Sequence, residues 1–223
     1  MARHLQRELE RLKKRILSLG AMVEERVRMA TRALEQTDMV RAEQIMATDY
    51  EVDEREVEVE EECLKILALH QPVAVDLRFL TAVIKINNDL ERIGDEAVNI
   101  ARCVTLIARK EPLNVALDFR TMAEKTQNML KHSLDSLVNL DLDIAFRVLT
   151  LDDEVDQIHS TMYDHVKTLI QKHPNRVGYL INHYLISRYL ERIADHATNI
   201  AEEVVYMIEG EIVRHGKWEQ QEE

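Results

Sequence analysis

The chain has 223 residues, 46% of them apolar, and a formal net charge of −12. That length and apolar fraction are enough for one large domain or for two small repeats with a packed core. The 5 glycines, 3 prolines and 4% of aromatic residues are too few for a β-sandwich or barrel, and they favour a helical protein. The negative charge disfavours a phosphate-backbone surface, so we expect no nucleic-acid partner.

Three features of the sequence lead us to expect a cytoplasmic protein with reduced thiols. No segment approaches the roughly 18 uninterrupted apolar residues that a membrane-spanning helix needs. The start of the chain mixes acids with bases and lacks an apolar secretory core. Cys63 and Cys103 have no Cys-x-x-Cys spacing, and we expect both to be buried and reduced.

The spacing of apolar residues predicts long helices. The first helix carries one apolar stripe with steps of three or four residues, formed by Leu5, Leu9, Leu12, Ile16, Leu19, Val23, Val27, Ala30 and Leu34. The other expected helices run from Asp38 to about His70, Pro72 to about Arg109, Leu113 to Leu140, Asp141 to Lys172, and Pro174 to Glu209, with Gly210 as the stop. Short connections between long helices imply antiparallel neighbours, and hence an all-α fold of two tandem three-helix bundles.

An internal repeat organises the chain. Residues 89–101 and 189–201 are identical at nine of thirteen positions. An Asp-x-x-x-Asp pair also precedes each copy, at Asp49 and Asp53 and again at Asp152 and Asp156, each followed by a proline turn. We interpret the chain as a duplicated three-helix unit, with one bundle in residues 1–111 and the other in 112–223.

Carboxylates gather in each repeat. Glu91, Asp95 and Asn99 are spaced by four, which places them on one helix face. In an antiparallel hairpin, residues equally far from the turn lie level, so the preceding aspartate pair should meet Glu91 and Asp95. The candidate metal ligands are Asp49, Asp53, Glu91, Asp95 and Asn99 in the first repeat and Asp152, Asp156, Glu191, Asp195 and Asn199 in the second.

Four close carboxylates repel unless protons, basic side chains or a cation balance them. Oxygen ligands favour magnesium, manganese or calcium, and carboxylate-rich bundles also hold iron. His159 and His196 could make the second cluster softer, because the first repeat has glutamates at these positions. The alternative is a pair of solvated helix faces with surface ion pairs from Arg55, Arg92, Arg188 and Arg192.

Catalytic motifs are absent from the sequence, and we expect a non-enzyme. There is no evident triad and no phosphate-cradling glycine loop. The runner-up is a carboxylate-bridged dimetal enzyme, although the ferritin-like pattern wants Glu-x-x-His on two helices and only Asp156-x-x-His159 approaches it. A third reading is a helical scaffold without metal.

The duplicated L-E-R-I-[GA]-D-x-A-x-N-I-A helix, at residues 90–101 and 190–201, resembles the PhoU family of phosphate transport regulators. The resemblance implies a cytoplasmic homodimer that negatively regulates the phosphate-starvation response and phosphate uptake. Its implied partners are the ATPase subunit of the phosphate ABC transporter and a phosphate-sensing histidine kinase, with the membrane reached only through them. It also implies metal clusters at the E/D-x-x-x-D pairs, holding iron, zinc, manganese, magnesium or calcium.

Overall fold

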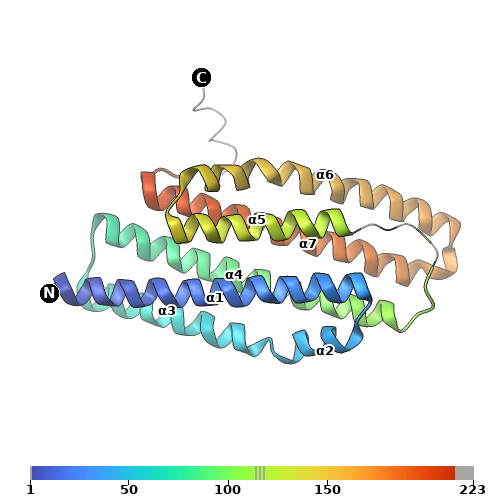
Figure 1. The fold of residues 1–223 in the computed structure, drawn as a ribbon, viewed down its shortest axis with the longest axis horizontal. Helices are drawn as coiled ribbons and strands as arrows, with labels where there is room; N and C mark the ends of the chain where they lie inside the picture. Colours follow the sequence, from blue (N-terminus) through green and yellow to red (C-terminus); the bar gives the residue numbers. More distant parts are fainter. Residues whose placement is uncertain (1, 114, 116, 118, 214–223) are drawn as a thin grey trace, which may run out of the picture.

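The computed structural model describes residues 2–113, 115, 117 and 119–213, and all regular secondary structure in these ranges is helical. The helices are α1 (Ala2–Gln36), α2 (Met39–Ala47), α3 (Tyr50–His70), α4 (Ala74–Ala108), α5 (Arg120–Asn139), α6 (Leu142–Lys172) and α7 (Val177–Glu209), with a 3₁₀ turn, η1 (Pro174–Arg176), before α7. Figure 1 shows α1 to α4 together below α5 to α7, with the long helices along one common direction. The predicted all-α fold of two helix bundles is confirmed.

The repeated segments meet at the centre of the molecule. They lie on α4 and α7, which pack against each other and run in opposite directions in Figure 1. The helices α1 and α3 pack on α4, while α5 and α6 pack on α7. The two units therefore join through the helix in which they are most alike. The predicted boundary at 111/112 falls in the connection between α4 and α5, and the independence of the two halves stays a prediction.

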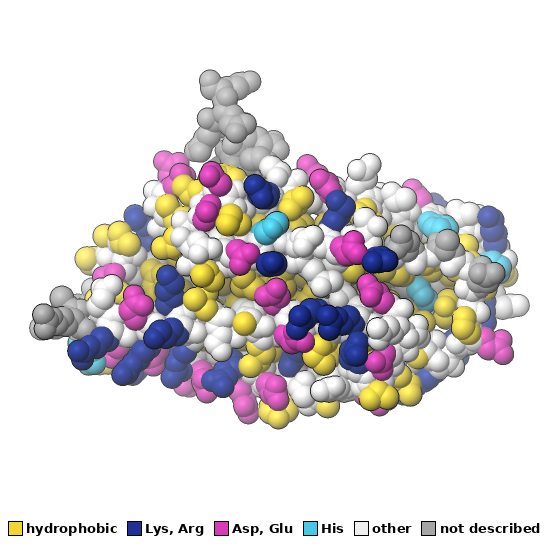
Figure 2. Space-filling view, viewed as in Figure 1, with side chains coloured by type: hydrophobic (Ala, Val, Ile, Leu, Met, Phe, Trp, Pro, Cys, Tyr) yellow, Lys and Arg dark blue, Asp and Glu magenta, His cyan; other side chains and the backbone are white. Residues whose placement is uncertain are grey.

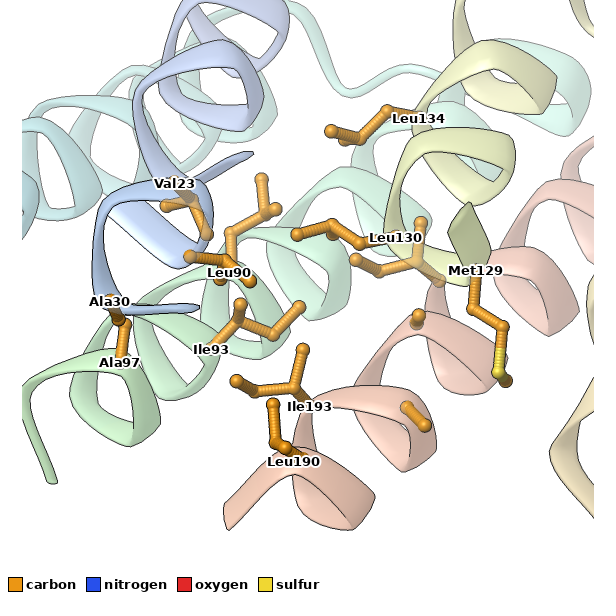
Figure 3. Packing of buried hydrophobic residues seen from close by; sticks show 14 of the residues in the cluster. Val23, Ala30, Leu90, Ile93, Ala97, Met129, Leu130, Leu134, Leu190 and Ile193 are labelled. Carbon is orange, nitrogen blue, oxygen red and sulfur yellow. The ribbon is translucent and has the colours of Figure 1, made fainter. Parts of the chain in front are cut away.

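One apolar core runs through both bundles. Figure 3 shows part of this core, in which the following labelled side chains are fully buried: Val23, Leu90, Ile93, Leu130, Leu190 and Ile193. The stripe predicted on the first helix is confirmed, because Leu9 to Ala30 of that stripe are buried and Leu5 and Leu34 pack against the core. Ala30 of α1 lies beside Ala97 of α4, where small side chains let the two helices approach closely.

The second predicted helix, Asp38 to His70, is wrong as a single element. Asp38 does cap α2, since its carboxylate accepts from the Arg41 backbone N–H at 3.0 Å. The helix ends at Ala47, and α3 begins at Tyr50. Between the two helices, the Thr48 and Asp49 carbonyls each accept a hydrogen bond from the backbone N–H three residues later, as in a tight turn. Both carbonyls also accept hydrogen bonds from the Arg26 guanidinium. In the second repeat α6 crosses the equivalent position without a break.

The predicted start of the fourth helix at Leu113 is also wrong. Helix α5 begins at Arg120, and the described residues before it are not helical. Apolar residues alternate with polar or small ones from Leu113 to Phe119, a period of two that suits an extended segment. Leu113, Val115 and Leu117 pack against the core, and Phe119 is buried. The backbone bonds from Val115 to Leu113 and from Leu117 to Val115 are tight turns of an extended chain.

The proline turns and the glycine stop are close to their predicted places. Gln71 ends α3 in the left-handed conformation and α4 begins at Ala74, so Pro72 lies just before the helix and not in its first turn. Pro174 opens the short η1 turn. Gly210 ends α7 with φ of 80°, a conformation that glycine adopts without strain, which confirms the predicted stop.

The described residues also bear on the expectations about membrane spans and cysteines. None of the described helices is long and apolar enough to cross a membrane. Cys63 and Cys103 are free and buried as predicted, and burial raises the thiol pKa of Cys63 to about 12 and that of Cys103 to about 11. Figure 2 shows acidic and basic side chains interspersed over one face, without a broad patch of a single sign.

Candidate metal centre

The second repeat brings three predicted ligands together. Asp156 of α6 and Glu191 and Asp195 of α7 each offer an oxygen, and these atoms lie within 4.8 Å of one another. Asp156 and Asp195 are exposed, and Glu191 is half-buried. We call these residues the acidic trio. The antiparallel packing of the two helices therefore brings together carboxylate oxygens that could coordinate a hard divalent cation.

Asp152 borders the acidic trio one turn before Asp156. Its carboxylate accepts a hydrogen bond from the Thr198 hydroxyl at 3.2 Å. Burial and the neighbouring Asp195 raise the pKa of Asp152 to about 6. An open hollow of about 350 Å³ adjoins these residues, lined by Asp152, Arg192, Asp195, His196, Thr198 and Asn199. The fourth predicted carboxylate of this repeat is therefore next to the trio but outside it.

The trio carries more negative charge than its surroundings balance. Burial and then the nearby Glu191 raise the pKa of Asp195 to about 6. Burial and then Asp156 raise the pKa of Glu191, while Arg188 and Arg192 lower it to a lesser extent. Proton uptake at mildly acidic pH and cation binding at neutral pH are two ways of relieving the same repulsion.

The first repeat places its four carboxylates near one another in a looser arrangement. Asp53 and Asp95 raise the pKa of Asp49 and of Glu91, in each case after the larger effect of burial. In the described part of the chain, however, no three of these acids bring oxygens within 4.8 Å of one another. The two predicted clusters both exist as electrostatic neighbourhoods, but the acidic trio is confined to the second.

A guanidinium lies within the first cluster. Arg26 of α1 is 5% exposed, and its Nη1 donates to Asp49 Oδ1 at 2.8 Å. Its Nη2 donates to the Thr48 carbonyl at 2.6 Å, and Nη1 reaches the Asp49 carbonyl at 3.3 Å. Arg26 therefore holds one carboxylate of the cluster and also bonds the backbone at the break between α2 and α3. Its charge offsets part of the burial that raises the pKa of Asp49.

Sequence reasoning missed Arg26, although a signal was available. It lies three residues after Val23 and four before Ala30, among the buried residues of the α1 stripe. The equivalent residue of the second repeat is Met129, because both positions lie twelve residues before an N-cap aspartate. Met129 is fully buried. Alignment of the two repeats would therefore have shown a charge in one core and a thioether in the other.

Asn99 and Asn199, also predicted as ligands, are not brought to the trio. The Asn99 amide donates to Glu96 Oε2 at 3.1 Å, and its oxygen accepts from Arg102. The Asn199 amide donates to Asp89 Oδ1 at 3.1 Å, across the contact of α7 with α4. Asn99 therefore bonds neighbours on its own helix, and Asn199 bonds across the junction between the bundles.

The two histidines that could have softened the second cluster bond elsewhere. His159 Nδ1 lies 3.1 Å from the Ser187 hydroxyl, and its ring stacks on Tyr184. His196 Nδ1 lies 2.8 Å from Asp89 Oδ1. Neither nitrogen joins the trio, so the donor set found by geometry is made of carboxylates.

The predicted surface arginines divide between the junction and the exterior. Arg192 pairs with the buried Glu96 at 2.8 Å, which joins α7 to α4. Arg55 pairs with Glu58 at 3.1 Å, and Arg92 bonds Asn88 on its own helix. None of these three bonds involves a predicted carboxylate ligand. The fourth, Arg188, lowers the pKa of Glu191, so part of the charge of the second cluster is balanced by a neighbouring arginine, as that alternative expects.

Comparison with known proteins finds relatives that match nearly the whole chain. The PhoU domain family matches residues 16–104 and 119–204, one match in each repeat. The chain is 35% identical over 209 residues to the phosphate-specific transport system accessory protein PhoU homolog of Pseudomonas aeruginosa, covering 93% of this chain and 86% of that protein. The homolog of Aquifex aeolicus is also 35% identical, with 94% and 95% covered.

Solved structures agree with the sequence comparison. The crystal structure of PhoU from Pseudomonas aeruginosa superposes with a TM-score of 0.90 at 34% identity, covering 92% of this chain and 99% of that one. The regulatory protein PhoU from Streptococcus pneumoniae gives a TM-score of 0.83 at 29% identity, with 95% and 100% covered. Both repeats, their order and their packing are shared, and the chain belongs to the PhoU family.

Proposed function

We propose that this chain is a cytoplasmic accessory regulator of a phosphate transport system. The observation that carries the proposal is the match along nearly the whole chain to proteins named for that system, at 35% identity and with the same fold. Both copies of the repeated helix fall inside the two family matches. The similarity is therefore not confined to a generic helix bundle.

In this role the chain restrains phosphate uptake and the phosphate-starvation response when phosphate is plentiful. It links the ATPase subunit of the phosphate ABC transporter to the phosphate-sensing histidine kinase, and it works as a homodimer. Such an adaptor lowers no reaction barrier. It needs surfaces whose affinity differs between the states of its partners.

Metal binding at the acidic trio is part of the proposal. Carboxylate oxygens that lie close together on two packed helices suit manganese, magnesium, calcium or iron better than zinc, which prefers nitrogen and sulfur ligands. A bound ion would neutralise the facing acids of α6 and α7. It would thereby fix the surface that these helices offer to a partner.

The proposal is tested in cells that lack their own copy of the gene. The wild-type chain should restore repression of phosphate-starvation genes in phosphate-rich medium, and tagged chain should capture the transporter ATPase. The double variant Asp156→Asn and Asp195→Asn should lose metal and weaken repression. Asp153→Asn, an exposed acid outside the trio, is the matched control and should behave as wild type.

Two outcomes would replace this account. Full repression by the metal-free double variant would leave a helical scaffold that needs no ion. Metal-dependent turnover of oxygen or a phosphoester by the purified chain would favour a dimetal enzyme. No described contact supports that second reading, because His159 bonds Ser187 and lies outside the trio.

A further inference from the structure

The two clusters contain the same acids and differ in what surrounds them. Asp49, Asp53, Glu91 and Asp95 correspond to Asp152, Asp156, Glu191 and Asp195, with no change of residue type. In the described part of the chain a trio of oxygens within 4.8 Å forms in the second set alone. The cause of this difference must therefore lie outside the acids.

The clearest difference is the buried Arg26 against the buried Met129. The guanidinium takes one oxygen of Asp49 at 2.8 Å, while the equivalent Asp152 receives a neutral hydroxyl from Thr198 at 3.2 Å. Arg192 borders the second cluster, but its Nη1 pairs with Glu96 at 2.8 Å. The first cluster thus has an arginine hydrogen-bonded to one of its acids. Near the second cluster, Arg192 is bound by another acid, and Arg188 acts on Glu191 only at longer range.

Arg26 also shapes the backbone from which the first cluster is built. Its bonds to the Thr48 and Asp49 carbonyls lie at the break between α2 and α3. The second repeat has a thioether in place of the donor, and α6 is continuous through the equivalent residues. Arg26 therefore holds one carboxylate of the first cluster and also stabilises the helix end at the break. The second cluster has no such helix end.

Resting on the proposed metal role, we infer that Arg26 is the permanent cation of the first cluster, so that the chain binds a divalent ion at the second cluster and excludes it from the first. A fixed guanidinium beside Asp49 repels an incoming cation. It also already bonds the Asp49 carboxylate, which the cation would need as a ligand. Release of that ligand would leave a buried charge without its partner, which is costly. The two repeats thus differ in metal binding although their clusters contain the same acids.

The test compares two equivalent substitutions in the full-length chain. Asp53→Asn and Asp156→Asn remove the corresponding acid from the first and second clusters. Binding of Mn²⁺ alone is measured by equilibrium dialysis with elemental analysis, and helix content and unfolding are followed for every variant. We expect about one Mn²⁺ per wild-type chain, weakened more than about tenfold by Asp156→Asn and less than about twofold by Asp53→Asn.

A second variant asks whether Arg26 is the cause. Arg26→Met copies the residue of the second repeat, and in the Asp156→Asn background it should create Mn²⁺ binding that Asp53→Asn then removes. If this variant does not fold, the comparison of the two asparagine variants still decides. Two ions per wild-type chain, with one lost in each asparagine variant, would overturn the inference while leaving the metal role intact. No Mn²⁺ bound by any variant would overturn both.

Discussion

The first and second repeats show how a duplicated unit can keep its core and change its charges. Leu90 and Leu190 are both fully buried in the shared interior. The carboxylates outside that interior are equally well matched in sequence, yet one set is joined to Arg26 and the other gathers as the acidic trio. Packing is tied to many neighbours at once, whereas a cluster on a helix face can be altered by one side chain from a third helix.

The comparison predicts that Arg26 matters more for stability than any equivalent charge in the second repeat. Arg26→Met should lower the free energy of unfolding by about 4 kcal/mol, because it leaves Asp49 and two carbonyls at the helix break without their donor. Urea unfolding measures the loss. Arg28→Met, an exposed residue paired with Glu25 on the same helix, is the control and should cost less than about 1 kcal/mol. Equal effects of the two substitutions would contradict the role assigned to Arg26.

The shared core should respond alike in both repeats. Leu90→Ala and Leu190→Ala should each lower the unfolding free energy by about 3 kcal/mol, because both side chains are fully buried in the shared core. The same urea titration measures both. A difference of more than about 2 kcal/mol would show that the interior is as asymmetric as the clusters.

The junction between the bundles should again separate the two copies. Arg192→Met should cost about 2 kcal/mol, since it leaves the buried Glu96 without its guanidinium partner. Arg92→Met, the equivalent change in the first repeat, removes a bond to the exposed Asn88 and should cost less than about 0.5 kcal/mol. Thermal unfolding of the two variants checks the ranking, and the reverse order would refute it.

The smallest expected effect is a pH dependence to which the second cluster contributes more than the first. Folding raises the pKa of Asp152 and Asp195 from 3.8 to about 6, so the folded chain holds protons that the unfolded chain releases. Their contribution is fully present below about pH 4 and is lost as the pH rises through 6. The urea concentration at the denaturation midpoint of the metal-free protein should therefore decrease as the pH rises from about 4 to about 6. Asp152→Asn should reduce that slope, and an unchanged slope would contradict the assignment.

Local sequence signals predicted most of the fold. The α1 stripe, the helix starts at Asp38 and Asp141 and the stop at Gly210 depend on residues close in the chain. At the break between α2 and α3 the backbone bonds Arg26, which lies more than twenty residues away, and such a contact leaves no signal in the sequence near Thr48. The extended segment before α5 could have been found, because its apolar residues alternate with a period of two.

The residues of the candidate site were predictable from the sequence. Which of the two clusters brings its carboxylates close together was not. Helix spacing and the hairpin turns brought Asp156, Glu191 and Asp195 to one place. The same reasoning gave the first cluster equal standing, because pairing across a turn ignores what the third helix contributes. Asn99 and Asn199 share a face with the acids at sequence level. In the structure Asn99 bonds neighbours on its own helix, and Asn199 bonds Asp89 across the contact of α7 with α4.

Anomalous diffraction from crystals of the wild-type chain grown with Mn²⁺ tests the central claim most directly. The account predicts one anomalous peak per chain, between Asp156, Glu191 and Asp195, and an Arg26 guanidinium still bonded to Asp49. Peaks of similar height at both clusters would contradict the asymmetry. The absence of any peak at the acidic trio, in protein that binds Mn²⁺ in solution, would contradict the site itself.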